Sequence, residues 1–392
     1  MKKIEILVSI IFLSIAFSKC KPSNNELNHV AEGALVFLNV KKEKELLLSD
    51  LFEKVSYLPI QLPEGMAIGQ FDKVIVEDEK IIIGDFYQSN QILILDTLGN
   101  FLANIKNLGD GPGNYIQLTD FSINTVDKSI DILSPNKILQ YNFEGEFISE
   151  SKLPIMGIYK FMSMPSNDYV FYIPENLSST LKDENSDGAV LFIFSQGKPT
   201  PILEDRRGSK NIPFMAERSI MQQFEDKIAF SNHFSDTIYL FKEREINTKF
   251  VLDFGKRKFP VEDFDIKGED ILNNPEYLER YSYHVPNLHY DGDFLISTYI
   301  DREWVTFFYQ ISSERLVSGA GFINDLDNGL TNLHVKALDK GQVYSFHYPE
   351  EFDFNKLAFD TQERVYWEKP GLLDPNVNFV IAKYSFWPQR KE

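Results

Sequence analysis

Short strand-like runs recur at a nearly constant spacing along this 392-residue chain, and the spacing restricts the folds open to it. Residues 91–102 (QILILDTLGNFL) align with residues 137–148 (KILQYNFEGEFI) at an offset of 46, which sets Gly99 over Gly145. Each unit holds four β-branched or aromatic runs separated by Gly, Asp and Asn turns. Four strands in ~40–50 residues is the size of one propeller blade.

Weaker copies follow, and the last copy lacks a strand. The same offset sets Asp85 over Asp131, and further units occupy residues 159–203, 218–254 and 287–318. The final unit has only three runs, and residues 54–62 (KVSYLPIQL) are available to complete it. A strand from the other terminus would close the ring and remove exposed sheet edges. The sequence therefore predicts an all-β, six-bladed β-propeller of four-stranded antiparallel blades, closed by an N-terminal strand. A pair of β-sandwiches or a β-solenoid is the alternative.

The N-terminus has the pattern of an export signal. Lys2 and Lys3 precede the apolar stretch Ile6–Phe17, which is shorter than the ~20 residues that a membrane-spanning helix needs. The only cysteine, Cys20, follows this stretch directly, at the place of the lipidated cysteine of bacterial lipoproteins. We expect a lipoprotein-type signal peptide, with an ordinary signal peptide as the alternative. The expected division is a signal at 1–19, a polar tether at 20–34 and a single propeller domain at 35–392, with a helical insertion near 261–283.

Composition limits the partners and cofactors. The formal net charge is −18, so the bulk surface repels nucleic acid and anionic lipid. We expect no nucleic-acid partner and membrane contact through the lipid anchor only. A single cysteine allows neither an intrachain disulfide nor a cysteine-rich zinc site.

Four runs together give the chain a family resemblance. The chain resembles the six-bladed β-propeller lipoproteins of Bacteroidetes, which are related in shape to NHL-repeat propellers. The resemblance covers nearly the whole mature chain and implies a fold and an exported location, but no reaction. It rests on residues 57–85, 92–115 (ILILDTLGNFLANI…GDGPGNY), 235–255 (SDTIYLF…FVLDFG) and 378–386 (NFVIAKYSF). We expect the protein in the cell envelope, as an outer-membrane lipoprotein.

The loop GDGPGNY at residues 109–115 is the most glycine-rich stretch. It has neither the Lys-Ser/Thr of a Walker loop nor the strand-to-helix setting of a dinucleotide fingerprint. We expect it to join the outer strand of the first blade to the inner strand of the second. Loops of this kind gather around the channel mouth, so Asp110, Asn114 and Tyr115 are candidate ligand-binding residues.

Four more candidates fall in turns expected on the same face: Tyr87, His233, Arg302 and His347. Such groups can hydrogen-bond a sugar and stack on its apolar side. Residues Asp183, Asn185 and Asp187 fit the first positions of a calcium loop, but Phe194 stands where the bidentate Glu is required. Weak calcium binding is therefore the only cofactor considered, and the alternative is a solvated loop.

Three functions remain open from the sequence. The first is a non-catalytic binding module for a glycan or peptide, or a docking protein for an envelope partner. The second is a polysaccharide lyase or glycoside hydrolase, recognisable by a His/Tyr or carboxylate pair converging in the channel. The third is a structural scaffold of an envelope complex, recognisable by an exposed apolar patch.

Overall fold

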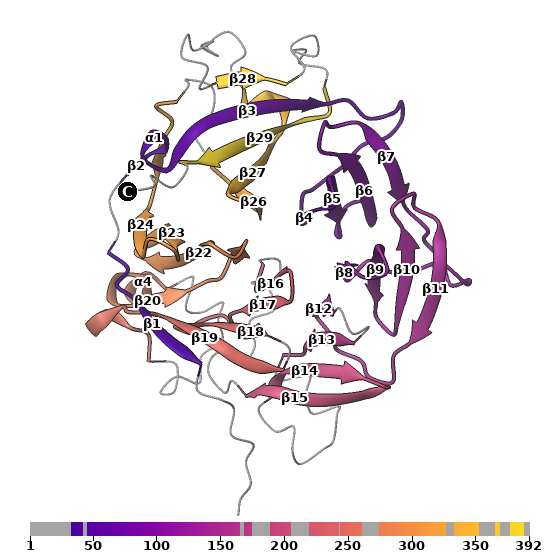
Figure 1. Cartoon of the computed structure of the whole chain (residues 1–392), viewed down its shortest axis with the longest axis horizontal. Coiled ribbons are helices and arrows are strands. Elements are labelled where there is room, and N and C mark those ends of the chain that lie inside the picture. The colour runs from indigo at the N-terminus through magenta and orange to yellow at the C-terminus, as the bar shows by residue number, and fades with distance from the viewer. Residues whose placement is uncertain are drawn as a thin grey trace, which may run out of the picture.

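In the computed structural model, six β-sheets stand around a central axis as the blades of a propeller (Figure 1). This confirms the predicted fold class. The described residues are 33–41, 45–164, 168–174, 189–204, 219–242, 244–260, 274–326, 333–352, 365–368 and 377–387. No helix among them is long and apolar enough to cross a membrane.

Blades 1 to 3 are four-stranded antiparallel sheets. The strands of each blade are given in order from the innermost to the outermost. Blade 1 consists of β4 (Lys73–Glu77), β5 (Lys80–Asp85), β6 (Gln91–Asp96) and β7 (Phe101–Ile105). Blade 2 consists of β8 (Asp120–Asn124), β9 (Ser129–Ser134), β10 (Lys137–Asn142) and β11 (Phe147–Lys152). Blade 3 consists of β12 (Lys160–Ser163), β13 (Tyr169–Tyr172), β14 (Ala189–Ser195) and β15 (Lys198–Glu204).

Blades 4 to 6 carry extra strands. Blade 4 has β16 (Met221–Phe224), β17 (Lys227–Phe230), β18 (Thr237–Lys242) and β19 (Glu245–Leu252), with β1 (Ala34–Leu38) added parallel to β19. In blade 5, β20 (Ser282–His284) and β21 (His289–Tyr290) both pair with β22 (Phe294–Asp301), followed by β23 (Glu303–Gln310) and β24 (Arg315–Gly319). Blade 6 has β26 (Val335–Asp339), β27 (Gln342–His347), β29 (Phe379–Phe386), β3 (Phe52–Ile60) and β28 (Val365–Trp367).

The N-terminal segment closes the ring, as predicted. Strand β3 pairs antiparallel with β29, and Tyr57 lies opposite Ala382. The rest of this segment follows the rim of the molecule: β1 joins blade 4, and β2 (Leu46–Leu47) pairs with β25 (Phe322–Ile323) near blade 5 (Figure 1). The helix α1 (Leu48–Leu51) leads into β3. Strand β1 covers the outer edge of blade 4, whereas β2 and β25 form a separate two-stranded sheet. The sequence predicted neither pairing.

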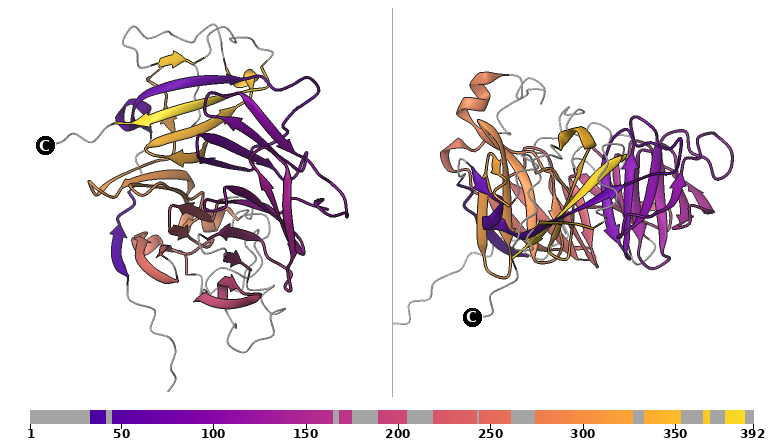
Figure 2. Two further views of the ribbon diagram at one scale, coloured as in Figure 1. Left: turned by 45° about the vertical axis from the view of Figure 1, so that its right-hand side comes forward. Right: turned by 90° about the horizontal axis from the view of Figure 1, so that it is seen from above.

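Six clusters of buried apolar side chains fill the six junctions between neighbouring blades. The middle strands of a blade are therefore covered on both faces, which explains apolar runs such as QILILD in place of strict alternation, whereas an outer strand such as β11 is exposed. Figure 2 shows the molecule edge-on as a flat disc, with helix α4 (Pro275–Arg280) standing out from one face. This helix lies within the segment 261–283, of which residues 261–273 are outside the described residues.

The repeat alignment holds for the outer strands of the first two blades and fails for the inner ones. Strands β6 and β10 keep the offset of 46, and Gly99 and Gly145 share a positive φ of 77° and 79°. The equivalence of Asp85 and Asp131 is wrong: Asp85 ends β5, whereas Ser134 ends β9. The turn before β9 (residues 125–128) is longer than the turn before β5 (residues 78–79), which shifts the register.

Candidate functional site

A cavity of about 830 Å³ lies at the axis of the ring, and all six blades line it. The innermost strands all start at this cavity, so their first residues surround it. These residues are Lys73, Asp120, Lys160, Met221, His289 and Val335. The volume falls within the range of small-molecule sites.

The rest of the lining is mixed. Aromatic and apolar groups include Phe71, Trp304 and Tyr348, and neutral polar groups include Gln222 and Asn287. Such a lining offers apolar faces and hydrogen-bonding groups to one ligand. It suits an amphipathic molecule better than a purely apolar one.

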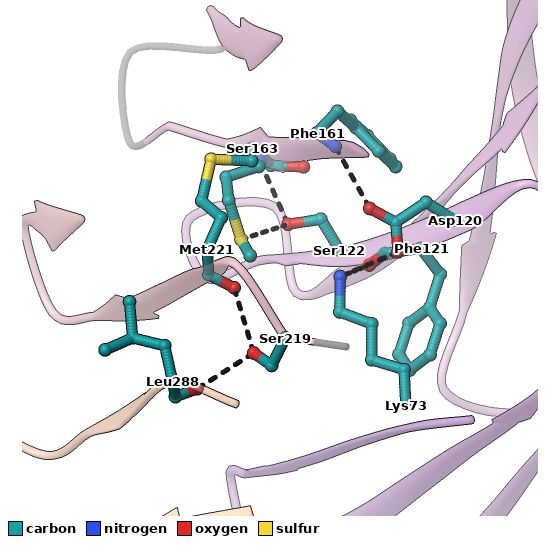
Figure 3. Close-up of polar contacts among 10 residues, drawn as sticks. Lys73, Asp120, Phe121, Ser122, Phe161, Ser163, Ser219, Met221 and Leu288 are labelled. Atoms are coloured by element: carbon teal, nitrogen blue, oxygen red, sulfur yellow. Dashed lines mark hydrogen bonds and ion pairs between the residues drawn. The ribbon is translucent and has the colours of Figure 1, made fainter. Parts of the chain in front are cut away.

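An ion pair joins the first three blades at the cavity wall (Figure 3). Lys73 Nζ lies 2.9 Å from Asp120 Oδ1 and donates a 2.6 Å hydrogen bond to the carbonyl of Phe121. Asp120 Oδ2 accepts a 3.0 Å hydrogen bond from the amide of Phe161. Burial lowers the pKa of Lys73, and the nearby Lys160 lowers it further, while Asp120 opposes both effects. The pair thus holds blades 1, 2 and 3 in a fixed arrangement.

Further bonds fix neighbouring blades around the same cavity. Ser122 Oγ accepts a 2.9 Å hydrogen bond from the amide of Ser163, and Ser219 Oγ donates a 2.8 Å bond to the carbonyl of Leu288 (Figure 3). Lys336 Nζ donates a 2.7 Å bond from blade 6 to the carbonyl of Phe71, just before blade 1. The wall of the cavity is therefore held in place before any ligand arrives.

Two polar groups of the wall stand apart from this bonding. Lys160 is 8% exposed, and its ammonium lies over the rings of Phe86 and Tyr159 at 5.2 and 5.6 Å. Among the described residues, this ammonium has no hydrogen-bond acceptor and no ion-pair partner. His289 is 3% exposed, and its Nε2 has no hydrogen-bond partner. Burial, with help from Lys336, lowers the pKa of His289 to about 3, so the ring is neutral at physiological pH.

A Ser–His–Glu chain lies behind the cavity. Ser345 Oγ is 2.8 Å from His347 Nε2, and His347 Nδ1 is 3.1 Å from Glu351 Oε2. Ser345 is fully buried and does not line the cavity, and its Oγ accepts a hydrogen bond from the amide of His334. A nucleophile must reach its substrate. The chain therefore reads as a structural tie between β26, β27 and the turn that follows.

Comparison with known proteins identifies the family. The family described as "Domain of unknown function (DUF4934)" matches residues 35–385. The chain belongs to this family. The matched range covers all six blades of this DUF4934 protein.

A solved structure at 14% identity shares the fold, and two further proteins show similarity. A protein of Bacteroides fragilis NCTC 9343, whose name describes it as exported, has a TM-score of 0.62 at 14% identity, over 91% of the DUF4934 chain and 100% of that chain. A DUF4221 family member of Bacteroides vulgatus ATCC 8482 has a TM-score of 0.46 at 9% identity, over 86% and 98%. A "MATH and LRR domain-containing protein PFE0570w" of Plasmodium falciparum is 24% identical over 358 residues, but the DUF4934 chain spans only 3% of that protein's length.

The glycine-rich loop of the DUF4934 protein joins β7 to β8, as predicted, and packs between two blades. Tyr115 is fully buried, and its hydroxyl donates to the carbonyls of Asn90 (2.8 Å) and Ile105 (3.1 Å). Asp110 is exposed and Asn114 is half-buried. None of these three candidates lines the cavity. The loop thus has an evident packing role.

The four turn candidates lie at the ends of second strands, as expected, but none lines the cavity. His233 and His347 are buried, and Tyr87 is half exposed. Arg302 Nε pairs with Glu279 at 3.2 Å. A ligand-binding role for all seven candidates stays a prediction.

Two predicted sites cannot be placed. Cys20 and the calcium candidates Asp183, Asn185 and Asp187 lie outside the described residues. Within the described ranges, no group of three or more His, Cys, Asp or Glu side chains is placed to hold a metal ion.

Sequence reasoning missed the cavity residues Lys73, Lys160, His289 and Lys336. It searched the loops for chemistry, whereas these groups stand at or next to the first position of an inner strand. A signal was available, because each lysine interrupts an otherwise apolar run (KVIV, KFMS, VKAL). Its meaning depends on knowing which strand of each blade is innermost.

Proposed function

We propose that this protein is an exported, lipid-anchored binding module that takes up a small ligand, a glycan or a peptide, in its central cavity without catalysing a reaction. The observation that carries the proposal is a cavity ringed by all six inner strands and fixed by hydrogen bonds between blades. Pre-arranged walls reduce the conformational entropy lost on binding.

The lining supports binding over catalysis. An enzyme of the lyase or hydrolase class needs an acid and a base that converge on the substrate. Among the described lining residues, no hydrogen bond joins a histidine to a tyrosine or one carboxyl group to another. The neutral polar groups and aromatic rings of the wall are instead those of a recognition site.

The location rests on the N-terminal sequence. The signal-like residues 1–19 and Cys20 support export and lipid attachment, with the outer membrane as the proposed site. The B. fragilis protein that shares the fold is also described as exported.

The test is a thermal-shift screen of the purified protein against neutral and acidic oligosaccharides and short peptides. A ligand at 100 times its Kd should add ~2.7 kcal/mol to the free energy of unfolding. Thr306→Trp should fill the cavity and abolish the shift, because Thr306 lines the wall. The matched Thr200→Trp on the exposed side of β15 should keep it.

Two results would contradict the proposal. A flat response over the whole panel would argue against a ligand site. A shift that persists in Thr306→Trp would place the ligand outside the central cavity.

A further inference from the structure

We propose that the cavity recognises an acidic saccharide, and that Lys160 binds the carboxylate of a uronic acid unit. This inference rests on the proposed function and names the class of ligand.

The cavity has an excess of cationic groups inside an acidic protein. Three lysines, Lys73, Lys160 and Lys336, line it together with two carboxylates, Asp72 and Asp120. Lys73 is paired with Asp120, and Lys336 and Asp72 attract one another. Of these three lysines, Lys160 alone has no carboxylate partner among the described residues. Removing a charge from water without a counter-charge is unfavourable, and Lys160 is only 8% exposed.

The setting of Lys160 leaves room for an anion. A buried ammonium is normally paired with an acid or hydrogen-bonded to carbonyls. Here two aromatic faces attract the charge but accept no conventional hydrogen bond. Asp120, the nearest acid of the wall, is occupied by Lys73 and by the amide of Phe161. An incoming carboxylate would supply the missing acceptor.

His289 gives a second, independent indication of a ligand. It lines the same cavity from blade 5, while Lys160 lines it from blade 3. Its neutral ring leaves Nε2 without a partner, although a buried polar atom normally has one. A neutral imidazole nitrogen donates to an oxygen or accepts from a hydroxyl, according to its tautomer. A polyhydroxylated ligand satisfies either case when the ring turns towards the cavity, because Nε2 itself is buried.

The remaining lining favours a sugar acid over a simple anion. Trp304 and Tyr348 line the cavity, and aromatic rings can stack on the apolar side of a sugar, while Gln222, Asn287 and Thr306 offer partners for hydroxyls. The single uncompensated ammonium matches the single charge of a carboxylate.

The experiment is calorimetric titration of the purified protein with digalacturonate, with neutral galactobiose and with inorganic phosphate. We expect digalacturonate to bind at least about tenfold more tightly than galactobiose. Lys160→Met should remove about tenfold or more of the digalacturonate affinity and leave galactobiose unchanged. Lys160→Arg should keep most of the affinity for digalacturonate, because it keeps the positive charge. The matched control Lys198→Met, on the exposed outer strand β15, should leave this affinity unchanged.

The outcomes separate this inference from the proposed function. Equal affinity for the two disaccharides, or undiminished digalacturonate binding in Lys160→Met, overturns the acidic-saccharide site and leaves a neutral-ligand module. Binding of phosphate without digalacturonate overturns it in favour of a different anion. Digalacturonate binding that survives Thr306→Trp overturns both proposals. Circular dichroism spectra identical to that of the parent protein show that each variant has folded.

Discussion

At the scale of single residues, burial and hydrogen bonding give two aspartates of neighbouring blades opposite properties. Burial raises the pKa of Asp131 to about 6, although Ser163, Gln140 and Ser129 all donate to its carboxylate. Burial by itself would also raise the pKa of Asp85. Hydrogen bonds from Ser89 and from backbone amides favour the charged carboxylate more strongly, so the pKa of Asp85 is lowered. Sequence alone assigns both residues the same role.

The pKa of Asp131 predicts a pH dependence of stability. Because the folded pKa is raised, the folded state keeps a proton that the unfolded state releases. The stabilisation is complete below pH ~4 and is lost as the pH rises through about 6. From pH 4.5 to 7.5, the wild type should therefore lose about 2 kcal/mol of unfolding free energy relative to Asp131→Asn. Urea unfolding of both proteins at the two pH values measures this difference.

Asp85→Asn is the matched control for that experiment. Because the pKa of Asp85 is lower in the folded state, its carboxylate stabilises the fold at every pH above the pKa of the unfolded state. This contribution is lost only when the pH falls below that value. Between pH 4.5 and 7.5 the difference between wild type and this variant should therefore stay nearly constant, because Asp85 is mostly ionised in both the folded and the unfolded state over this range. The same trend in both variants would contradict the assignment.

At the scale of elements, the glycine-rich loop shows how a turn fixes one blade against the next. Gly113 has a φ of 74°, and its amide donates to Glu150 of β11 at 3.2 Å. A Cβ at this position would come within 3.0 Å of the Phe147 ring. The loop therefore needs glycine here both for backbone conformation and for space.

Gly113→Ala should lower the free energy of unfolding by roughly 2–3 kcal/mol, since a left-handed conformation costs about 1–2 kcal/mol and the ring contact adds to it. Gly197→Ala isolates the first cost, because Gly197 has a φ of 78° with no atom within 4 Å of an added Cβ. Equilibrium urea unfolding measures both losses. Equal losses in the two variants would show that Phe147 yields without cost.

At the scale of the whole molecule, the closing strand β3 joins the two ends of the described chain. Phe52, at its start, is fully buried and packs on Tyr384 and Phe386 of blade 6 and on Phe308 of blade 5. The two ends of the propeller thus share one apolar cluster. We expect the ring to unfold as a unit when this closure weakens.

Phe52→Ala should lower the free energy of unfolding by about 3–5 kcal/mol, because it creates a cavity at the closure. Unfolding should occur in a single transition that is the same by far-UV circular dichroism and by tryptophan fluorescence. Phe37→Ala is the matched control, because Phe37 lies on β1 with 67% of its surface exposed. It should change the free energy of unfolding by less than about 0.5 kcal/mol. Separate transitions in the two signals would contradict unfolding as a unit.

The fold class, the number of blades and the closing strand could all be predicted from the repeat pattern. These follow from local information: the strand-forming runs, the glycine turns such as Gly99 and Gly145, and one strand missing from the last repeat. The repeat also placed the glycine-rich loop between the first two blades. Local patterns suffice here because each blade is built from consecutive strands.

The residues that form the central cavity could not be predicted from local patterns, because they come together only in the folded ring. Lys73, Lys160 and His289 meet because six inner strands converge on one axis, although the residues are far apart in the chain. The lengths of single turns set the register of each inner strand, as the misplaced pairing of Asp85 with Asp131 shows. Burial then left the ammonium of Lys160 without a counter-charge, since its neighbours' carboxylates were engaged elsewhere. Convergence, register and burial are properties of the assembled ring.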